Sequence, residues 1–244
     1  MPRFHIPKLP AAGSQAELPE RVVRHIQVLR LNAGDALILF DGSGREAPAV
    51  LLSLGRRSAL CRVDAPVETD RESPLHITLI QAVSAGERMD FTLQKSVELG
   101  VAAIQPVLGG RSVVRLSGER ADKRQARWQE IAVSACEQCG RNRVPQVLSL
   151  LDLPAALDAL ADPAALRLLA SPHQAAPLSS FRQPESCRLQ LMVGPEGGWT
   201  PQEEALARER GFAAFTLGPR ILRTETAALA AISALQTLWG DFGA

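Results

Sequence analysis

The pattern of hydrophobic and polar positions predicts two regions with different secondary structure. Residues 1–72 contain short apolar runs separated by turn residues, together with one amphipathic helix over 19–30. Short strands at this spacing are typical of a small β-rich domain, and we expect them to form a barrel. From residue 73 onward, buried strands alternate with helical patterns, which is typical of an α/β domain with a mostly parallel sheet. We therefore predict a β-barrel domain over 1–72 and an α/β domain over 73–244, joined by a charged, proline-containing linker at 63–74.

The α/β region has a regular order of elements. The apolar runs predict strands over 75–83, 102–108, 166–170, 188–193 and 213–217, and the helical patterns predict helices over 87–99, 120–139, 152–160 and 225–239, with one more beginning at Pro201. Thr200 is suited to the N-cap of that helix, and Glu203 completes a capping box with it. We expect 172–184, which contains several prolines, to be a loop.

Two loops near the C-terminus are candidates for a ligand site. Residues 193–200 read VGPEGGWT and residues 217–226 read LGPRILRTET, and each follows an apolar run and precedes a helix. In parallel sheets, ligands bind in crevices at the carboxyl ends of the strands, where these loops are expected. Glycine lets the backbone approach a ligand closely, although the same residues also suit ordinary tight turns. Neither loop is a GxGxxG or a phosphate-binding P-loop, so the usual nucleotide-binding patterns are absent.

Charge is distributed unevenly along the chain. The 244 residues include 46% apolar residues and carry a formal net charge of +1, so an anionic partner must be held by a local patch. Residues 109–145 supply such a patch, because eight basic residues against four acidic ones give them a charge of +4. Arg141-Asn142-Arg143 suits contacts with phosphate and bases, which favours RNA, although the dipole of the preceding helix explains one cation there.

The cysteines and the N-terminus bear on the compartment. The chain has four cysteines, no long apolar run, and a beginning without the apolar segment of a signal peptide. We therefore expect a cytoplasmic protein with reduced thiols and no membrane segment. Cys136 and Cys139 have CxxC spacing but lack a second pair and a nearby histidine ligand, so helix packing is favoured over a zinc or redox site.

The final helix is apolar on almost every side. Alanine, leucine and isoleucine fill most of 225–239, so the helix must be covered on several faces. A second subunit is a natural cover near a chain terminus, and we predict a symmetric dimer with this helix in the interface. The alternative is a helix buried wholly within its own domain.

With these patterns in place, the chain resembles a known family over nearly its whole length. It is similar to ribosomal RNA small-subunit methyltransferase E, in the SPOUT class of S-adenosylmethionine-dependent RNA methyltransferases. The Arg3-Phe4 start and 37–44 resemble the family's N-terminal PUA-like barrel. The methyltransferase motifs are matched by KSVELGV at 95–101, EQCGRNRVP at 137–145, GPEGG at 194–198 and LGPRILRTET at 217–226. The last two at this spacing are highly specific, whereas Ser171-Pro172-His173 matches the family less well.

The resemblance implies a fold, a reaction and partners. The expected fold is a PUA-like RNA-binding β-barrel followed by a SPOUT α/β domain with a deep trefoil knot. The expected reaction transfers a methyl group from S-adenosyl-L-methionine to N3 of a uridine in the decoding region of 16S rRNA. The donor is already activated, so no metal is needed. The expected partners are the small ribosomal subunit and a second copy of the chain.

The resemblance and the chemistry together give candidate site residues. Arg223 could stabilise negative charge on the uracil oxygens, and Glu225 could take the N3 proton. Alternatively, Arg223 forms a salt bridge across the loop. Glu225 could also be present only because the helix dipole favours an acidic residue in the first turn of a helix. The candidates for cofactor binding are Val193, Gly194, Glu196, Gly197, Gly198, Leu217, Gly218, Ile221, Leu222 and Thr224. The candidates for RNA binding are Arg3, Arg111, Arg115, Arg141, Asn142 and Arg143.

Other functions are compatible with parts of the pattern. A different SPOUT enzyme would act on another RNA or on a ribose hydroxyl. A non-catalytic RNA-binding assembly factor could keep the fold without the reaction. A dinucleotide-dependent oxidoreductase is disfavoured, because no GxGxxG with a downstream acid is present.

Overall fold

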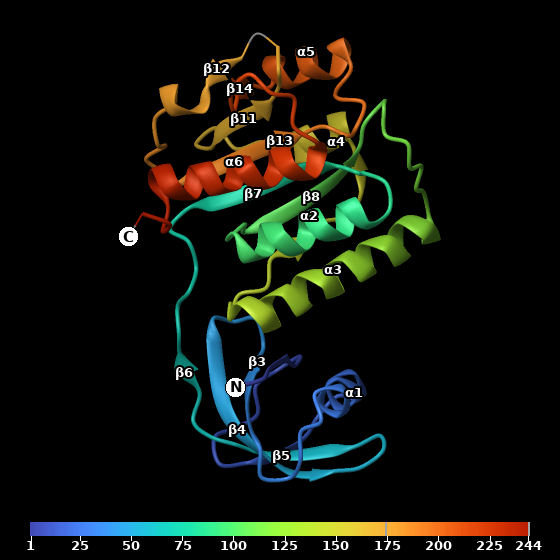
Figure 1. Ribbon diagram of the computed structural model, residues 1–244, viewed down its shortest axis with the longest axis vertical. Helices are drawn as coiled ribbons and strands as arrows, with labels where there is room; N and C mark the ends of the chain where they lie inside the picture. Colours follow the sequence, from blue (N-terminus) through green and yellow to red (C-terminus); the bar gives the residue numbers. More distant parts are fainter. Residues whose placement is uncertain (174, 244) are drawn as a thin grey trace. The chain divides into compact units, whose positions relative to one another are not determined.

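The chain divides into two compact units. The computed structural model describes residues 1–173 and 175–243 (Figure 1). The first unit contains Met1–Glu72 together with Cys136–Val144, and the second contains Ser73–Ala135 and the chain from Pro145 onward. The segment that carries Arg141-Asn142-Arg143 thus packs with the N-terminal residues.

The first unit is built on a six-stranded sheet. Its strands are β1 (Arg3–His5), β2 (Gln15–Glu17), β3 (Ala36–Phe40), β4 (Arg45–Leu54), β5 (Ala59–Val63) and β6 (Val67–Glu68), and its helix is α1 (Glu20–Val28). The strand order is β1-β3-β4-β5-β2, with β6 paired to β4. Within the described residues β1 and β2 stay at opposite ends of this order, so the strand pairing forms no closed barrel and the expected barrel is not confirmed. β6 also places a short strand inside the segment expected to be a linker.

The apolar face of α1 covers this sheet. The amphipathic pattern predicted an apolar face of Val22, Val23, Ile26 and Leu29. The first three are buried and share one core with Phe4 and Leu39, whereas Leu29, which follows the last residue of α1, is 45% exposed. β1 reaches that core through parallel pairing with β3, in which Phe4 lies opposite Leu39.

The second unit is an α/β structure with a wholly parallel described sheet. Its strands are β7 (His76–Ala82), β8 (Ala103–Leu108), β9 (Gln146–Val147), β10 (Leu151–Asp152), β11 (Leu166–Ala170), β12 (Ala176–Pro177), β13 (Arg188–Val193) and β14 (Ala213–Thr216). The order is β10-β8-β7-β13-β11-β14-β12, with β9 paired to β8. Every described pairing is parallel, which confirms the predicted sheet type.

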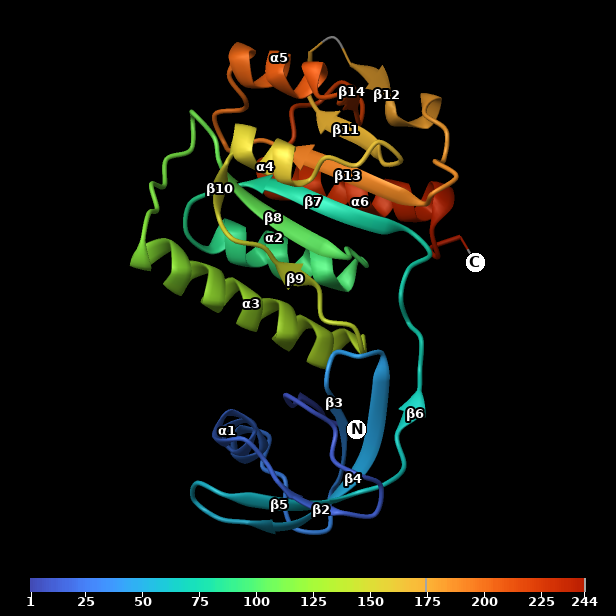
Figure 2. The ribbon, with the colours of Figure 1, turned by 180° about the vertical axis from the view of Figure 1, so that it is seen from behind.

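Helices cover both faces of this sheet. They are α2 (Glu87–Glu98), α3 (Glu119–Cys139), α4 (Leu153–Ala159), α5 (Pro201–Glu209) and α6 (Thr224–Trp239), with a short 3-10 helix at Leu178–Ser180. α2 and α6 pack side by side on one face, while α4 and α5 lie on the other, as the two opposite views show (Figures 1 and 2). The segment 172–184, expected to be a loop, contains β12 and the 3-10 helix.

Local sequence signals explain several element ends. The Thr200 side chain accepts from the Glu203 backbone and the Glu203 side chain accepts from the Thr200 backbone, so the predicted capping box begins α5. α2 ends just before Gly100, whose φ of +90° is a conformation that glycine adopts readily.

α6 is only partly enclosed by its own unit. Ala228, Ala231, Ile232 and Leu235 are buried, whereas Leu238 is 46% exposed. None of the described helices combines the length and the hydrophobicity that crossing a membrane would need.

Candidate active site at the carboxyl ends of the parallel strands

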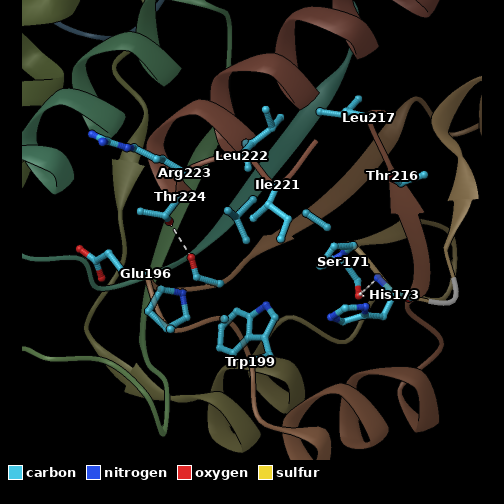
Figure 3. A pocket seen from close by; sticks show the side chains of 18 of the residues that line it. Ser171, His173, Glu196, Trp199, Thr216, Leu217, Ile221, Leu222, Arg223 and Thr224 are labelled. Atoms are coloured by element: carbon cyan, nitrogen blue, oxygen red, sulfur yellow. Dashed lines mark hydrogen bonds between the residues drawn. The ribbon is translucent and has the colours of Figure 1, made fainter. Parts of the chain in front are cut away.

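Three neighbouring strands direct their following loops to one place. β11 lies between β13 and β14, and because all three are parallel their carboxyl ends meet at the same edge of the sheet. A cavity of about 590 Å³ opens there, lined by the loops after β11, β13 and β14 and by the start of α6 (Figure 3). The two glycine-bearing loops therefore share one cavity, as the sequence predicted.

Most of the predicted cofactor-binding residues line this cavity. They are Val193, Gly194, Glu196, Gly197, Gly198, Leu217, Ile221, Leu222 and Thr224. Gly218 is not among the lining residues; it has a φ of +103°, and its carbonyl accepts a hydrogen bond from the Thr216 hydroxyl at 2.9 Å. Gly218 thus shapes the turn after β14, which places its neighbour Leu217 at the cavity.

A side-chain hydrogen bond joins the two loops. The Thr224 hydroxyl donates to the Gly194 carbonyl at 2.6 Å (Figure 3). Thr224 begins α6 and is buried, so this bond ties the start of that helix to the loop after β13. Gln81, at the end of β7, donates in turn to the Thr224 hydroxyl at 3.0 Å.

The glycines of the first loop are required by close packing. A Cβ atom at Gly194 would lie 3.1 Å from Nε1 of Trp199, and one at Gly197 would lie 3.0 Å from Cβ of Arg111. Trp199 is buried beneath the cavity and belongs to the core between the sheet and α4 and α5. The loop can hold this shape because neither position carries a side chain.

Glu196 is held at one end of the cavity. Its Oε1 accepts from the Ala85 backbone N–H at 3.0 Å and from the Arg88 guanidinium at 3.1 Å. Burial acts to raise the pKa of Glu196, but hydrogen bonds from the Glu196 and Ala85 backbone N–H groups and from Arg88 outweigh it and hold that pKa below its usual value. Glu196 is therefore held as a carboxylate that is paired with the Arg88 cation at this end of the cavity.

Arg111 and Arg115, predicted to bind RNA, contact backbone carbonyls. Arg111 lines the cavity and donates to the carbonyls of Gly197 and Trp199 at 3.0 and 3.2 Å. Arg115 donates to the Gly109 and Gly110 carbonyls at 3.4 and 3.1 Å. These bonds stabilise the loop after β8 and attach it to the GPEGG loop.

The two candidate catalytic residues both line the cavity. Arg223 is exposed and forms no ion pair with any residue that the structure describes, so the alternative of a salt bridge across the loop has no support there. Its side chain extends away from Thr216 and Leu217, toward the end of the cavity where Glu196 lies (Figure 3). Glu225 is in the first turn of α6, and its Oε2 is buried without a hydrogen-bond partner among the described residues.

The structure adds residues that the sequence reasoning did not assign to the site. Ser171 and His173 line the cavity, and the His173 backbone N–H donates to the Ser171 hydroxyl at 3.2 Å (Figure 3). Arg88, Glu204 and Arg220 also line it. Gln81, which donates to Thr224 from outside the cavity lining, was missed as well; its only signal in the sequence was an amide among the buried positions of β7.

Three of the remaining RNA candidates pack within the first unit, where Arg141 and Asn142 are buried and Arg3 is half-buried. Glu46 Oε2 accepts from Arg3 at 2.7 Å and from the Asn142 amide at 3.0 Å, and Arg3 also donates to Asn142. Arg141 is 5% exposed and forms an ion pair with Glu72. Contact between these residues and RNA stays a prediction, because the interactions described here are internal to the unit.

Glu46 is the centre of that network. Burial favours its neutral form, but hydrogen bonds from Arg3, Asn142 and Arg71 outweigh burial and lower the pKa of Glu46 to about 2. The carboxylate is therefore ionised at neutral pH, as a buried acid must be when it holds cationic partners. Arg143, by contrast, is exposed.

The environment of Cys136 favours a packing role for the CxxC motif. Cys136 is buried, and burial raises its pKa to about 12, so the thiol stays protonated at neutral pH. In the part of the chain that the structure describes, no group of three or more His, Cys, Asp or Glu side chains is placed to hold a metal ion.

Comparison with known proteins identifies related domains in both units. Residues 71–236 match the RNA methyltransferase domain family, and residues 18–64 match the RNA methyltransferase PUA domain family. Among curated relatives, the Ribosomal RNA small subunit methyltransferase E of Bacillus subtilis is 33% identical, with 88% of this chain and 87% of that protein covered. The protein of the same name from Buchnera aphidicola (Acyrthosiphon pisum) is also 33% identical, over 88% and 85% of the two chains.

Solved structures agree with these relatives. A Neisseria gonorrhoeae Ribosomal RNA small subunit methyltransferase E bound to S-adenosyl methionine is 53% identical, with a TM-score of 0.93 and 99% of each chain covered. A Legionella pneumophila protein in complex with the cofactor SAM is 37% identical, with a TM-score of 0.93 over 98% of each chain. The cavity at the strand ends thus belongs to a fold and a sequence family that match along almost the entire chain. This chain belongs to the ribosomal RNA small subunit methyltransferase E family of RNA methyltransferases.

Proposed function

We propose that this protein is an S-adenosylmethionine-dependent methyltransferase that methylates N3 of a uridine in the decoding region of 16S rRNA. The observation that carries the proposal is the cavity in which the Thr224 hydroxyl joins the LGPRILRTET loop to the Gly194 carbonyl of the GPEGG loop. Related structures of the same family contain S-adenosylmethionine.

The cavity fits this cofactor by size and by lining. Its volume of about 590 Å³ lies within the roughly 300–1,000 Å³ typical of small-molecule sites. A Cβ at Gly194 or Gly197 would collide with Trp199 or Arg111, so the GPEGG loop carries no side chain at these positions and offers a ligand only its peptide groups there. Those peptide groups suit the polar edge of an adenine and the charged ends of an amino acid. Leu217 and Leu222 suit the apolar surface of the adenine. Glu196 suits an ammonium group or a sulfonium.

The reaction needs a proton acceptor and a fixed positive charge. Bound S-adenosylmethionine supplies an electrophilic methyl group, and the uracil nitrogen must approach it to roughly 3–3.5 Å. Uracil N3 carries a proton and is a poor nucleophile until that proton leaves. We assign proton acceptance to Glu225, whose buried Oε2 has no partner among the described residues. Arg223 stabilises the negative charge that develops on the uracil oxygens as the proton leaves.

Arg223→Ala tests this assignment. We expect the rate of methylation to fall at least about a hundredfold, in the range that loss of one charge-stabilising group produces. Arg220→Ala, from the same loop, is the matched control because it also removes a cation lining the cavity. Equal effects of the two substitutions, or wild-type cofactor affinity and methylation in Arg223→Ala, would contradict the role of Arg223.

RNA contacts are proposed for both units. Residues 1–72 form the RNA-binding domain and residues 73–244 the methyltransferase domain, as the two family matches support. Arg143 contacts the rRNA through its exposed guanidinium. Arg111 and Arg115 donate to loop carbonyls and add positive charge near the cavity. Arg3, Arg141 and Asn142 support RNA binding indirectly, because they fix the position of the segment that carries Arg143.

Three further properties complete the proposal. The protein is a homodimer, with α6 in the interface, and it acts in the cytoplasm on the small ribosomal subunit. The chain around the two glycine-bearing loops forms a trefoil knot, as in the SPOUT class. The exposed Leu238 on α6 supports the dimer, and the bond between Thr224 and Gly194 brings together the segments that such a knot would involve.

The direct test is to map the modified nucleotide. Small ribosomal subunits from cells lacking the enzyme are incubated with purified protein and S-adenosylmethionine, and mass spectrometry locates the added methyl group, with naked rRNA as the comparison. One methyl on uridine N3 in the decoding region supports the proposal. Methyl transfer to another position would show a different RNA methyltransferase, and no transfer despite cofactor binding would contradict the proposed reaction.

A further inference from the structure

Gln81 is a buried polar residue in the middle of the parallel sheet. It lies near the end of β7, is 0% exposed, and pairs in the ladder with Val193, the residue before Gly194. Its Nε2 donates to the Ala82 carbonyl and to the Thr224 hydroxyl, both at 3.0 Å. Its Oε1 is buried and has no hydrogen-bond partner among the described residues.

The contacts of Gln81 fix the direction of a hydrogen-bond chain. An amide nitrogen donates and does not accept, so the Thr224 oxygen is the acceptor in the bond with Gln81. The single hydroxyl proton of Thr224 is then left to point at the Gly194 carbonyl, 2.6 Å away. The orientation of the Thr224–Gly194 bond, which joins the two glycine-bearing loops, is therefore set by Gln81 in the sheet below them.

Stability of the sheet does not explain this amide. The neighbouring positions Leu79, Ile80 and Ala82 are all fully buried and apolar, so an apolar side chain would suit the position. A buried acceptor without a partner destabilises the folded state, because it has lost its hydrogen bonds to water. An amide whose Oε1 is unpaired is thus unfavourable for folding. The same amide, however, supplies the N–H that donates to the Thr224 hydroxyl oxygen.

We propose that Gln81 is a positioning residue for the methyl-donor site, acting through Thr224 on the GPEGG loop. This role rests on the proposed function of the cavity. Gln81 does not line the cavity; it acts by ordering the two loops before the cofactor arrives. Loops that are ordered in advance lose less conformational freedom on binding, which increases affinity.

The chain contains a matched control for this residue. Gln105 on β8 is 2% exposed, and its Nε2 donates to the carbonyl of the next residue, Pro106, and to the Ser149 carbonyl, both at 2.8 Å. It pairs with Ile80 in the ladder, so it faces the opposite side of the sheet from Gln81. Gln81→Met and Gln105→Met therefore remove the same buried amide from adjacent strands, but only the first breaks a chain that leads to the cavity.

The test measures cofactor affinity and loop order in full-length protein. Isothermal titration gives the Kd for S-adenosylmethionine, and amide hydrogen exchange of the cofactor-free protein reports on 194–200 and 217–224. For Gln81→Met we expect a Kd about tenfold weaker, as expected for loss of a single hydrogen bond, and faster exchange in both loops. Gln105→Met should keep the wild-type Kd and loop exchange, and the unfolding midpoint of each variant is measured alongside to confirm that both are folded.

Two further variants separate positioning from general damage. Gln81→Glu replaces the donor by an acceptor that draws the Thr224 proton away from Gly194, so affinity should fall at least as far as in Gln81→Met. Thr224→Val should weaken binding, and adding Gln81→Met to it should cost little more, because both act through one chain.

The outcomes distinguish this role from the function on which it rests. Wild-type affinity and loop exchange in Gln81→Met, with normal binding by the unmodified protein, would overturn the positioning role and leave the proposed function intact. Equal losses in the two Met variants would also overturn it. If the unmodified protein does not bind S-adenosylmethionine, the proposed function fails and the role of Gln81 fails with it.

Discussion

Gly194 and Trp199 show how the cavity depends on single residues. Gly194 supplies the carbonyl that Thr224 binds, and its missing Cβ leaves room for the indole of Trp199. Trp199 is 5% exposed and packed in the core, so the ring has little freedom to move away from a larger neighbour. The shape of the loop is therefore determined by packing beneath it as well as by its own backbone.

Gly194→Ala should consequently weaken cofactor binding. The added Cβ would lie 3.1 Å from Nε1 of Trp199, and the loop must shift to relieve the contact. Overpacking of this kind typically costs 1–3 kcal/mol, so we expect the Kd for S-adenosylmethionine, measured by calorimetry, to rise about tenfold or more. Gly55→Ala is the control, because its Cβ would lie as close to Ser58, at 3.1 Å, in the first unit. Unchanged affinity in Gly194→Ala would show that this close packing does not shape the site.

At the scale of elements, local signals in the sequence predicted most of the second unit. The pairing of Thr200 with Glu203, and the glycine after α2, mark element ends through contacts between near neighbours. Parallel strands could be expected from their alternation with helices, and the position of the cavity followed from the strand ends.

The features that sequence reasoning missed depend on contacts between distant residues. Arg3 binds Asn142 across 139 positions, and no local pattern shows that Arg3, Asn142 and Glu46 form one buried network. The absence of a closed barrel follows from strand pairing in the first unit, which short apolar runs do not specify. Gln81 was missed because the role of a buried amide is visible only once its partner, Thr224, is known.

The network around Glu46 makes the first unit sensitive to acid. The pKa of Glu46 is lowered from 4.5 to about 2, so its stabilising contribution is present above pH 4.5 and is lost as the pH falls toward 2. We expect the unfolding free energy of the wild-type protein to fall between pH 7 and pH 3 by about 2 kcal/mol more than that of Glu46→Gln, measured by urea titration with circular dichroism.

Glu68→Gln provides the comparison for this effect. Glu68 is exposed on β6, the strand that pairs with β4 beside Glu46, so its neutralisation should leave the pH dependence of the wild type unchanged. Parallel pH profiles for the wild type and Glu46→Gln would mean that the buried ion pairs do not account for acid sensitivity.

At the scale of the whole molecule, α6 links the cavity to the surface that we propose as the dimer interface. Its first turn carries Thr224 and Glu225 at the cavity, and its last turn carries the exposed Leu238. A helix that is apolar on several faces and only partly covered by its own unit favours association with a second copy.

We expect Leu238→Glu to weaken a homodimer. A charge placed in an apolar interface loses its hydration without gaining a partner, so the variant should shift from dimer to monomer in size-exclusion chromatography with light scattering. Leu52→Glu introduces the same charge at a 38% exposed position of β4 and should leave the mass unchanged. A monomeric wild-type protein, or a dimer unaffected by Leu238→Glu, would exclude this end of α6 as the interface.

The proposed function requires that the cavity between the two joined loops is a methyl-donor site. Its most direct test is isothermal titration of the full-length protein with S-adenosylmethionine, with Thr224→Val measured alongside to break the bond to Gly194. We expect saturable binding at one site per chain, and an affinity about tenfold weaker in Thr224→Val. Absence of saturable binding by the wild-type protein, or equal affinity in the two proteins, would contradict it.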